Sequence, residues 1–227
     1  MMPLDLSQTV VVLDLDDTLY PEVEYKKSGL RAVAEIVENL YGQSVARNWL
    51  ERPIQTERDY LDELCHVAGV PLTVKQSLMW AYRLHAPNIK LSENVRLTVD
   101  YLATQCLALA VLTDGRSISQ RSKLKALGLQ HLPAYISEDY RSEKPEKLRY
   151  NQIMYDFPAE KYVYVGDNPQ KDFLAPNRLG WQTIGLKGDN QNIHSQNENG
   201  LASEYLPKVW INRFDELGEC WPYASPN

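Results

Sequence analysis

The chain has 227 residues and a formal net charge of −6. It contains no run of Lys or Arg long enough to form a basic patch, which argues against a nucleic-acid partner. It also contains no apolar stretch of the length that crosses a membrane, and its N-terminus lacks the pattern of a secretory leader. The three cysteines, Cys65, Cys106 and Cys220, match neither a disulfide framework nor a metal knuckle. We therefore expect a cytoplasmic protein without a membrane partner, as a monomer or dimer.

An apolar run at Val10–Leu13 ends in three carboxylates, those of Asp14, Asp16 and Asp17. The run predicts a strand that is buried on both faces, as in the middle of a parallel sheet. Carboxylates are costly inside a protein unless they are paired or bound to a metal, so we expect them where the strand emerges. In open α/β sheets, that crevice is where ligands bind. A solvated acidic turn is the alternative interpretation.

Residues 21–90 show helical spacing of apolar residues and no strand signal. The predicted helices cover 28–41, 56–68 and 74–85. They indicate a small helical bundle inserted directly after the first strand. Three of its aromatic side chains are predicted to lie in the bundle core, namely Trp49, Trp80 and Tyr82.

From residue 91 onward, helical and strand patterns alternate, which predicts an α/β fold with a doubly wound parallel sheet. Its core is expected to comprise 1–20 and 91–219, with a loosely attached tail at 220–227 and a mobile loop at 188–200. The predicted strands are 107–112, 135–137, 162–165, 183–186 and 209–211. The predicted helices are 92–105, with Ser92 as a cap, then 117–128, 145–156 and 171–179.

Polar motifs stand at four strand or loop ends, in an order and spacing that resemble the haloacid dehalogenase-like hydrolase superfamily from about residue 9 to residue 217. They are the run from Asp14 through Asp17 to Leu19, Thr113, Lys144 before Pro145, and Gly166-Asp167 with Asp172. Each motif is weak alone, but all four in order form a strong signal. The helical insertion resembles the mobile cap that the phosphatase-rich branch of this superfamily carries between its first two motifs.

The resemblance implies magnesium-dependent hydrolysis of a phosphate monoester through an aspartyl-phosphate. Asp14 resembles the nucleophile. The magnesium ligands are implied to be the carboxylates of Asp14 and Asp167 and the main-chain carbonyl of Asp16. Asp16 resembles the general acid that protonates the leaving alkoxide and then the base that activates water. That role presumes a raised pKa for the Asp16 carboxyl.

The remaining motif residues are implied to bind the phosphoryl group. Thr113 and the amide of Asp114 would donate to a phosphoryl oxygen, and Lys144 would add a positive charge that also lowers the pKa of Asp14. Asp172 would orient Lys144 or a metal-bound water. Asp114 departs from the neutral residue that is frequent here, so its side chain either points away or weakens phosphate binding. A turn residue, a surface lysine and a solvated helix start are the alternatives for Thr113, Lys144 and Asp172.

Other polar residues are assigned lesser roles. Asp17 is expected to make backbone contacts in its loop. The basic residues that open the first inserted helix either meet an anionic substrate or form a solvated face: Lys26, Lys27 and Arg31. The histidines are expected to be packed or on the surface rather than catalytic: His66, His85, His131 and His194.

Several functions compete within this resemblance. Asp16 and Asp167 argue against dehalogenase chemistry, and Asp16 argues against phosphonate cleavage. A sugar phosphomutase keeps both aspartates, and a catalytically idle binding protein with the same fold is a further alternative. We favour a phosphatase that acts on a small phosphorylated metabolite, either a sugar phosphate or a nucleotide monophosphate.

Overall fold

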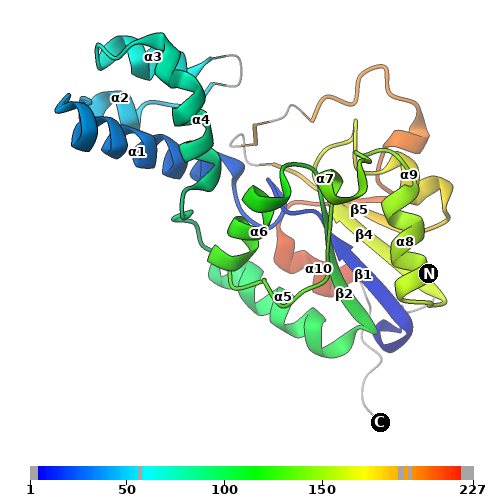
Figure 1. Ribbon diagram of the computed structural model, residues 1–227. Helices are drawn as coiled ribbons and strands as arrows, with labels where there is room; N and C mark the ends of the chain where they lie inside the picture. Colours follow the sequence, from blue (N-terminus) through cyan, green and yellow to red (C-terminus); the bar gives the residue numbers. More distant parts are fainter. Residues whose placement is uncertain (1–4, 56–57, 189–191, 194–195, 221–227) are drawn as a thin grey trace.

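The computed structural model describes residues 5–55, 58–188, 192–193 and 196–220. Within these residues, six parallel strands form one sheet in the order β3-β2-β1-β4-β5-β6 (Figure 1). The predicted parallel sheet is therefore confirmed, with each predicted strand present. The strands are β1 (Thr9–Leu13), β2 (Ala108–Thr113), β3 (Ala134–Ile136), β4 (Lys161–Gly166), β5 (Gln182–Leu186) and β6 (Val209–Ile211).

Helices cover both faces of the sheet, as the doubly wound prediction requires. They are α5 (Glu93–Gln105), α6 (Ser117–Ala126), α7 (Ser137–Tyr140), α8 (Leu148–Asp156), α9 (Leu174–Arg178) and α10 (Leu217–Cys220), with the 3₁₀ helices η1 (Leu6–Gln8), η3 (Ser203–Tyr205) and η4 (Phe214–Glu216). Among the described helices, none is both long and apolar enough to cross a membrane.

Strand β1 lies in the interior of the sheet because its side chains are apolar on both faces. Val11 and Leu13 belong to an apolar cluster shared with α5, α6 and η4. Val10 and Val12 point to the opposite face and join a cluster shared with α8 and α9. This alternation follows from the two-residue period of a strand. Because β1 ends at Leu13 between β2 and β4, the residues after Leu13 lie at the carboxyl edge of the sheet.

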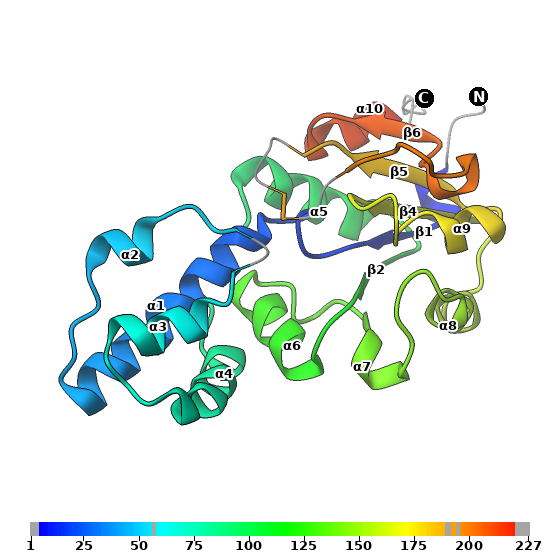
Figure 2. The same ribbon diagram turned by 90° about the horizontal axis from the view of Figure 1, so that it is seen from above.

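A second group of helices follows β1 and forms its own apolar core beyond one end of the sheet (Figures 1 and 2). It consists of α1 (Glu22–Tyr41), α2 (Arg47–Glu51), α3 (Tyr60–Val67), η2 (Leu72–Val74) and α4 (Lys75–Leu84). We call residues 22–84 the helical insertion. Its core contains Leu30, Val33, Val37, Trp49, Leu64 and Leu78, all of which are buried.

The insertion differs from the prediction at several points. Helix α1 begins at Glu22 rather than at residue 28, because its first turn is mostly polar and gives little apolar periodicity. The short helix α2 was not predicted. Trp80 was predicted in the core but is 53% exposed, with the Arg83 guanidinium over its ring. Of the other two aromatic side chains, Trp49 is buried and Tyr82 is partly buried against both the insertion core and the sheet cluster.

Helix boundaries in the α/β part also differ in detail. Helix α8 begins at Leu148 rather than at Pro145, and α9 is shorter than predicted. The prediction for Ser92 is confirmed, since its hydroxyl accepts a hydrogen bond from the amide of Val95 at 3.4 Å. The start predicted at residue 56 for α3 lies outside the described residues, and the described helix begins at Tyr60. The tail beyond Cys220 lies outside the described residues as well.

Candidate active site

The ends of three adjacent strands converge on one small cleft. Asp14 follows β1, Thr113 ends β2 and Asp167 follows β4, which are neighbours in the sheet. A cleft of about 120 Å³ opens among them. The residues that line it are Asp14, Asp16, Asp17, Glu22, Thr113, Asp114, Lys144, Asp167, Asn168 and Lys171. It therefore brings together every site residue predicted from the sequence except Asp172, which lies beneath it.

Lys144 bridges two carboxylates at the bottom of the cleft. Its Nζ lies 2.6 Å from Oδ1 of Asp14 and 2.6 Å from Oδ1 of Asp172. All three side chains are buried. The hydroxyl of Tyr164 donates to the same Asp172 oxygen at 3.1 Å. The positive charge is thus held directly beside Asp14 and cannot turn out into solvent without breaking two ion pairs.

Asp172 also fixes the loop that carries Asp167. Its second oxygen, Oδ2, accepts hydrogen bonds from the amides of Asp167 at 3.0 Å and Asn168 at 2.7 Å. Gly166 is required for this approach, because a Cβ at that position would lie 2.6 Å from Oδ2 of Asp172. Both oxygens of Asp172 are therefore committed to protein groups, and its carboxylate acts as a brace for the site.

Three carboxylates, those of Asp14, Asp167 and Asp172, offer oxygens within 4.8 Å of one another. Lys144 is the cation that pairs with this cluster, and among the described residues Asp167 forms no ion pair. Burial raises the pKa of Asp167 to about 9, and the negative charges of Asp172 and Asp14 add to the effect. The cluster thus carries more buried negative charge than the protein compensates. Its carboxylate oxygens are the kind of ligand that a hard divalent cation prefers.

Burial and neighbouring negative charge also raise the pKa of Asp14. Burial raises its pKa to about 7, Lys144 opposes this rise, and the charge of Asp172 reinforces it. The ion pair with Lys144 therefore only partly offsets the cost of burying this carboxylate. Additional positive charge at Asp14 and Asp167 would favour the ionised form of both side chains.

The carboxylate of Asp114, which also lines the cleft, is held by a buried arginine. The Arg149 side chain is fully buried, and its Nη2 lies 2.5 Å from Oδ1 of Asp114. Its Nη1 donates to the carbonyl oxygens of Thr113 at 2.8 Å and Tyr135 at 3.1 Å. The carboxylate of Asp114 also accepts from the amide of Lys144 at 3.2 Å. Asp114 thus neutralises a buried guanidinium.

Asp16 is held by a network that the sequence did not reveal. Lys123 Nζ lies 2.8 Å from both oxygens of the Asp16 carboxylate, and Tyr20 and Gln120 donate to it at 2.5 and 3.0 Å. Burial favours a higher pKa for Asp16, but the Lys123 charge and these hydrogen bonds outweigh it, so the pKa lies below its usual value. The raised pKa presumed for a general acid is therefore wrong for this arrangement.

Lys123 and Gln120 come from α6, whose buried face is unusually polar. Ser119, Gln120 and Lys123 are all buried on it, and the Gln120 amide also donates to Thr113 Oγ1 at 3.1 Å. The signal in the sequence was the small number of apolar residues in 117–123. A helix that packs against the protein with so few apolar residues must bury polar side chains, and these need hydrogen-bond partners.

A loop from far along the chain contacts the other side of the cleft. Asn192 donates to Oδ2 of Asp167 at 2.9 Å, and Gln196 donates to the Asp167 carbonyl at 2.7 Å. The amide of Ile193 donates to the Asp17 carboxylate at 2.8 Å. Three described residues of the loop at 188–200, which was predicted to be mobile, are therefore bonded to the site. Residues 189–191 and 194–195, including His194, lie outside the described residues.

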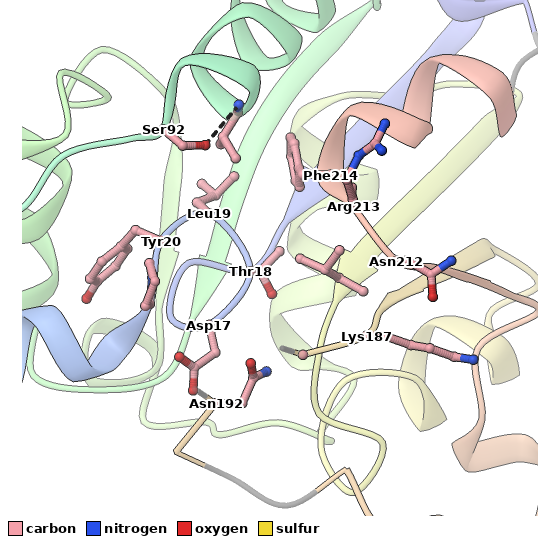
Figure 3. Close-up of a pocket in the computed structure, with 14 residues that line it drawn as sticks. Asp17, Thr18, Leu19, Tyr20, Ser92, Lys187, Asn192, Asn212, Arg213 and Phe214 are labelled. Carbon is pink, nitrogen blue, oxygen red and sulfur yellow. Dashed lines mark hydrogen bonds between the residues drawn. The ribbon is translucent and has the colours of Figure 1, made fainter. Parts of the chain in front are cut away.

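Asp17 lines both the cleft and a neighbouring cavity of about 250 Å³, and Figure 3 shows the residues around this second cavity. Its carboxylate also accepts from the amide of Glu22 at 2.8 Å, so both of these hydrogen bonds come from the backbone, as expected. In Figure 3, Asp17 and Asn192 lie together at one end of this cavity, and Lys187 and Arg213 lie on its opposite side.

The remaining predicted residues lie apart from the cleft. His85 is buried, with Nδ1 2.6 Å from the Tyr82 carbonyl and Nε2 3.1 Å from the Ser28 hydroxyl, and His66 and His131 are exposed. These three histidines are therefore packed or on the surface. Of the three basic residues that open α1, Lys26 lines a cavity of about 480 Å³ in the helical insertion.

Comparison with known proteins assigns the family. The model of the haloacid dehalogenase-like hydrolases matches residues 11–186, which include all four motifs. The chain belongs to the haloacid dehalogenase-like hydrolases. The resemblance inferred from the motifs is thus confirmed.

Related proteins cover almost the whole chain of this hydrolase. A glyceraldehyde 3-phosphate phosphatase from Methanopyrus kandleri is 26% identical over 91% of this chain and 94% of its own length. A ribulose-1,5-bisphosphate 5-phosphatase from Halopiger xanaduensis is 23% identical over 92% of this chain and 97% of its own. The Bacillus subtilis protein YfnB, crystallised with magnesium bound, superposes with a TM-score of 0.65 at 18% identity over 96% of this chain and all of YfnB. This last likeness is one of fold.

Proposed function

We propose that this hydrolase is a magnesium-dependent phosphatase that cleaves small phosphate monoesters through an aspartyl-phosphate on Asp14. The observation that carries the proposal is the buried contact of 2.6 Å between the Asp14 carboxylate and the Lys144 ammonium, beside the uncompensated carboxylate of Asp167. The phosphatase names of the relatives from Methanopyrus kandleri and Halopiger xanaduensis support the same reaction class.

In the first step, an oxygen of Asp14 attacks phosphorus, and the bond from phosphorus to the leaving alkoxide breaks. Lys144 balances charge on the transferring group, and the Thr113 hydroxyl with the Asp114 amide donates to its oxygens. Asp16 gives its proton to the alkoxide, which requires its carboxyl to be released from Lys123 and protonated.

In the second step, Asp16 takes a proton from water, the water oxygen attacks phosphorus, and the bond from phosphorus to Asp14 breaks. Inorganic phosphate leaves, and both aspartates return to their starting forms. Magnesium, held by Asp14, Asp167 and the main-chain carbonyl of Asp16, would supply positive charge against the phosphoryl oxygens. The uncompensated charge of the carboxylate cluster supports this assignment.

The proposal also covers the roles of the two parts of the chain, the class of substrate and the cellular location. Residues 21–90 act as a cap over the core formed by 1–20 and 91–219, and closure of the cap excludes water from the cleft. The helical insertion supports this division because it has an apolar core of its own. The relatives that act on sugar phosphates favour a phosphorylated sugar or a similar small metabolite over a nucleotide. The free thiols of Cys65 and Cys106 fit a cytoplasmic protein.

The test is turnover of p-nitrophenyl phosphate and a panel of phosphorylated sugars and nucleotides by the purified protein, with magnesium and with chelator. We expect magnesium-dependent release of phosphate from sugar phosphates. Asp14→Asn should remove turnover and the acid-stable labelling of the protein by radioactive phosphate, while Asp100→Asn, an exposed carboxylate on α5, should retain both. Equal turnover by the wild type and Asp14→Asn would exclude the covalent route.

A further inference from the structure

The helical insertion contains a cavity of about 480 Å³, a size typical of small-molecule sites. Among the described residues, its lining comes from α1, from α3 and the positions just before it, and from α4. Leu30 and Tyr82 supply apolar wall, and the charged groups among the described lining residues are Lys26, Arg58, Asp59 and Arg83. The phosphatase mechanism above uses none of these side chains.

The described residues that line the cavity carry an excess of positive charge, although the chain as a whole is acidic. Asp59, the one carboxylate among them, is bound at 2.6 Å by Lys75, which lies outside the cavity lining. Arg83 forms no ion pair within the described residues, and its guanidinium packs over the Trp80 ring at 5.3 Å. A cleft lined by one sign of charge raises the local concentration of ligands of the opposite sign.

The other two cations are only loosely paired. Lys26 Nζ lies 4.0 Å from Glu22, beyond hydrogen-bond distance. Arg58 Nε lies 3.7 Å from Glu63, whose other oxygen is bound by Arg52. Exchanging such contacts for a charge-assisted hydrogen bond to a ligand anion is favourable, because the long ion pairs contribute little.

Two connections place this cavity beside the active-site cleft. Lys26 stands one helical turn after Glu22, and Glu22 lines the cleft around Asp14. At the other wall, the carbonyl of Arg83 accepts a hydrogen bond from Ser119 at 3.1 Å, next to Gln120, whose amide reaches Asp16. In Figure 2, helix α4 and the first turns of α1 lie on the side of the insertion that faces α6.

We propose that this cavity binds a second anionic group of the substrate, a carboxylate or a second phosphate. The preferred substrates are then phosphate monoesters that carry another negative group several bonds from the scissile phosphoryl. This inference rests on the proposed phosphatase function and deepens it by naming the substrate class. Arg58 and Arg83 are the specificity residues, since guanidinium groups bind carboxylate and phosphate oxygens in a bidentate manner.

The test uses matched pairs of monoesters that differ in the distal group. These are 3-phosphoglycerate against glycerol 3-phosphate, and fructose 1,6-bisphosphate against fructose 6-phosphate. We expect the wild type to favour the anionic member in kcat/KM by about tenfold or more, and Arg83→Gln and Arg58→Gln to lower that ratio by about tenfold through KM. Preference in the first pair identifies a carboxylate, and in the second a phosphate.

Two further variants separate charge from structure. Arg83→Lys should restore part of the preference, because it keeps the charge but loses the fork of donors. Arg31→Gln removes an exposed arginine from α1 that does not line the cavity and should leave the ratio unchanged. Equal turnover of the anionic and neutral members by the wild type, or an equal loss of the ratio in Arg31→Gln, would overturn the proposal.

Direct measurement of ligand binding tests the anion site without relying on turnover. In calorimetric titrations of the full-length Asp14→Asn protein, the anionic member of a pair should bind about tenfold more tightly than the neutral member, and Arg58→Gln should abolish the difference. Equal affinities would overturn the cavity assignment even where p-nitrophenyl phosphate is hydrolysed. Absence of all turnover together with selective binding would instead overturn the phosphatase function and retain the anion site.

Discussion

The ammonium group of Lys123 lies 2.8 Å from each carboxylate oxygen of Asp16, and the same ammonium lies 4.2 Å from the centre of the Tyr25 ring. Tyr25 belongs to α1 of the helical insertion, whereas Lys123 belongs to α6 of the α/β part. The proposed acid is thus tied to a contact between the two parts of the chain. A movement of α1 would change the surroundings of Lys123 and, through them, those of Asp16.

Lys123→Met is expected to shift the pH dependence of the first chemical step. Lys123 favours the ionised form of Asp16, so its removal raises the pKa of that carboxyl. An acid must be protonated to act, so the limb on which kcat/KM falls with rising pH should move up by about one pH unit or more. Steady-state profiles with a poor leaving group measure the shift. Lys125→Met, which removes an exposed lysine from the same helix, is the control, and a shift of the same size there would refute the role of Lys123.

Asp16→Asn is expected to discriminate between leaving groups. An alkyl phosphate releases a strongly basic alkoxide that needs a proton, whereas nitrophenolate leaves without one. Loss of the acid should therefore lower kcat/KM for a sugar phosphate by about 10²-fold or more relative to the loss for p-nitrophenyl phosphate. Parallel measurements on both substrates give the ratio. Equal losses on both would show that Asp16 positions other groups instead of donating a proton.

The partners of Asp16 could not be predicted from the sequence. The apolar run of β1 and the cap at Ser92 were predictable because each depends on neighbours within a few residues. Lys123 meets Asp16 across 107 positions, and no local pattern in α6 says which carboxylate it will face. The sequence placed Asp14, Thr113 and Asp167 at one edge because parallel strands end together, but it could not supply the network around Asp16.

Asp114 and the loop after β5 illustrate the same limit. The partner of the Asp114 carboxylate, the fully buried Arg149, lies 35 positions further along the chain. Asn192 and Gln196 lie in a polar segment without periodicity, which resembles a free loop in sequence although both donate to Asp167. In each case the partner comes from another element, so the orientation follows from tertiary packing alone.

Metal binding and protein stability are expected to be linked through Asp167. Its pKa is raised from 3.8 to about 9, by burial first and then by Asp172 and Asp14, so the folded chain without metal binds a proton that the unfolded chain has lost. The free energy of unfolding should therefore fall as the pH rises through that window. Magnesium requires the ionised carboxylates, so its stabilisation should be larger near pH ~9 than near pH ~6.

Thermal melts with magnesium and with chelator at both pH values measure this linkage. At saturating metal we expect a gain in melting temperature of about 5 °C or more at the higher pH. Asp167→Asn should lose this gain and show a flatter dependence of stability on pH, since it cannot ionise. Asp100→Asn, on the exposed face of α5, should behave as the wild type. A gain that is equal at both pH values, or retained in Asp167→Asn, would place the metal elsewhere.

Arg149→Met is expected to destabilise the fold strongly. The guanidinium is fully buried, pairs with Asp114 and donates to the carbonyl oxygens of Thr113 and Tyr135. Removing it takes a donor from both carbonyls and leaves the Asp114 carboxylate with only the Lys144 amide at 3.2 Å and Lys171 at 4.0 Å. This should lower the free energy of unfolding by about 3–5 kcal/mol. Urea denaturation of the metal-free protein measures the loss.

The matched control for this substitution is Arg121→Met, which breaks an exposed ion pair with Asp139. It should cost at most about 1 kcal/mol, because solvent screens such pairs. The double variant Arg149→Met with Asp114→Asn should recover part of the loss, since it removes the stranded charge together with its partner. If the double variant is no more stable than Arg149→Met alone, the stranded charge of Asp114 is not what destabilises the single variant.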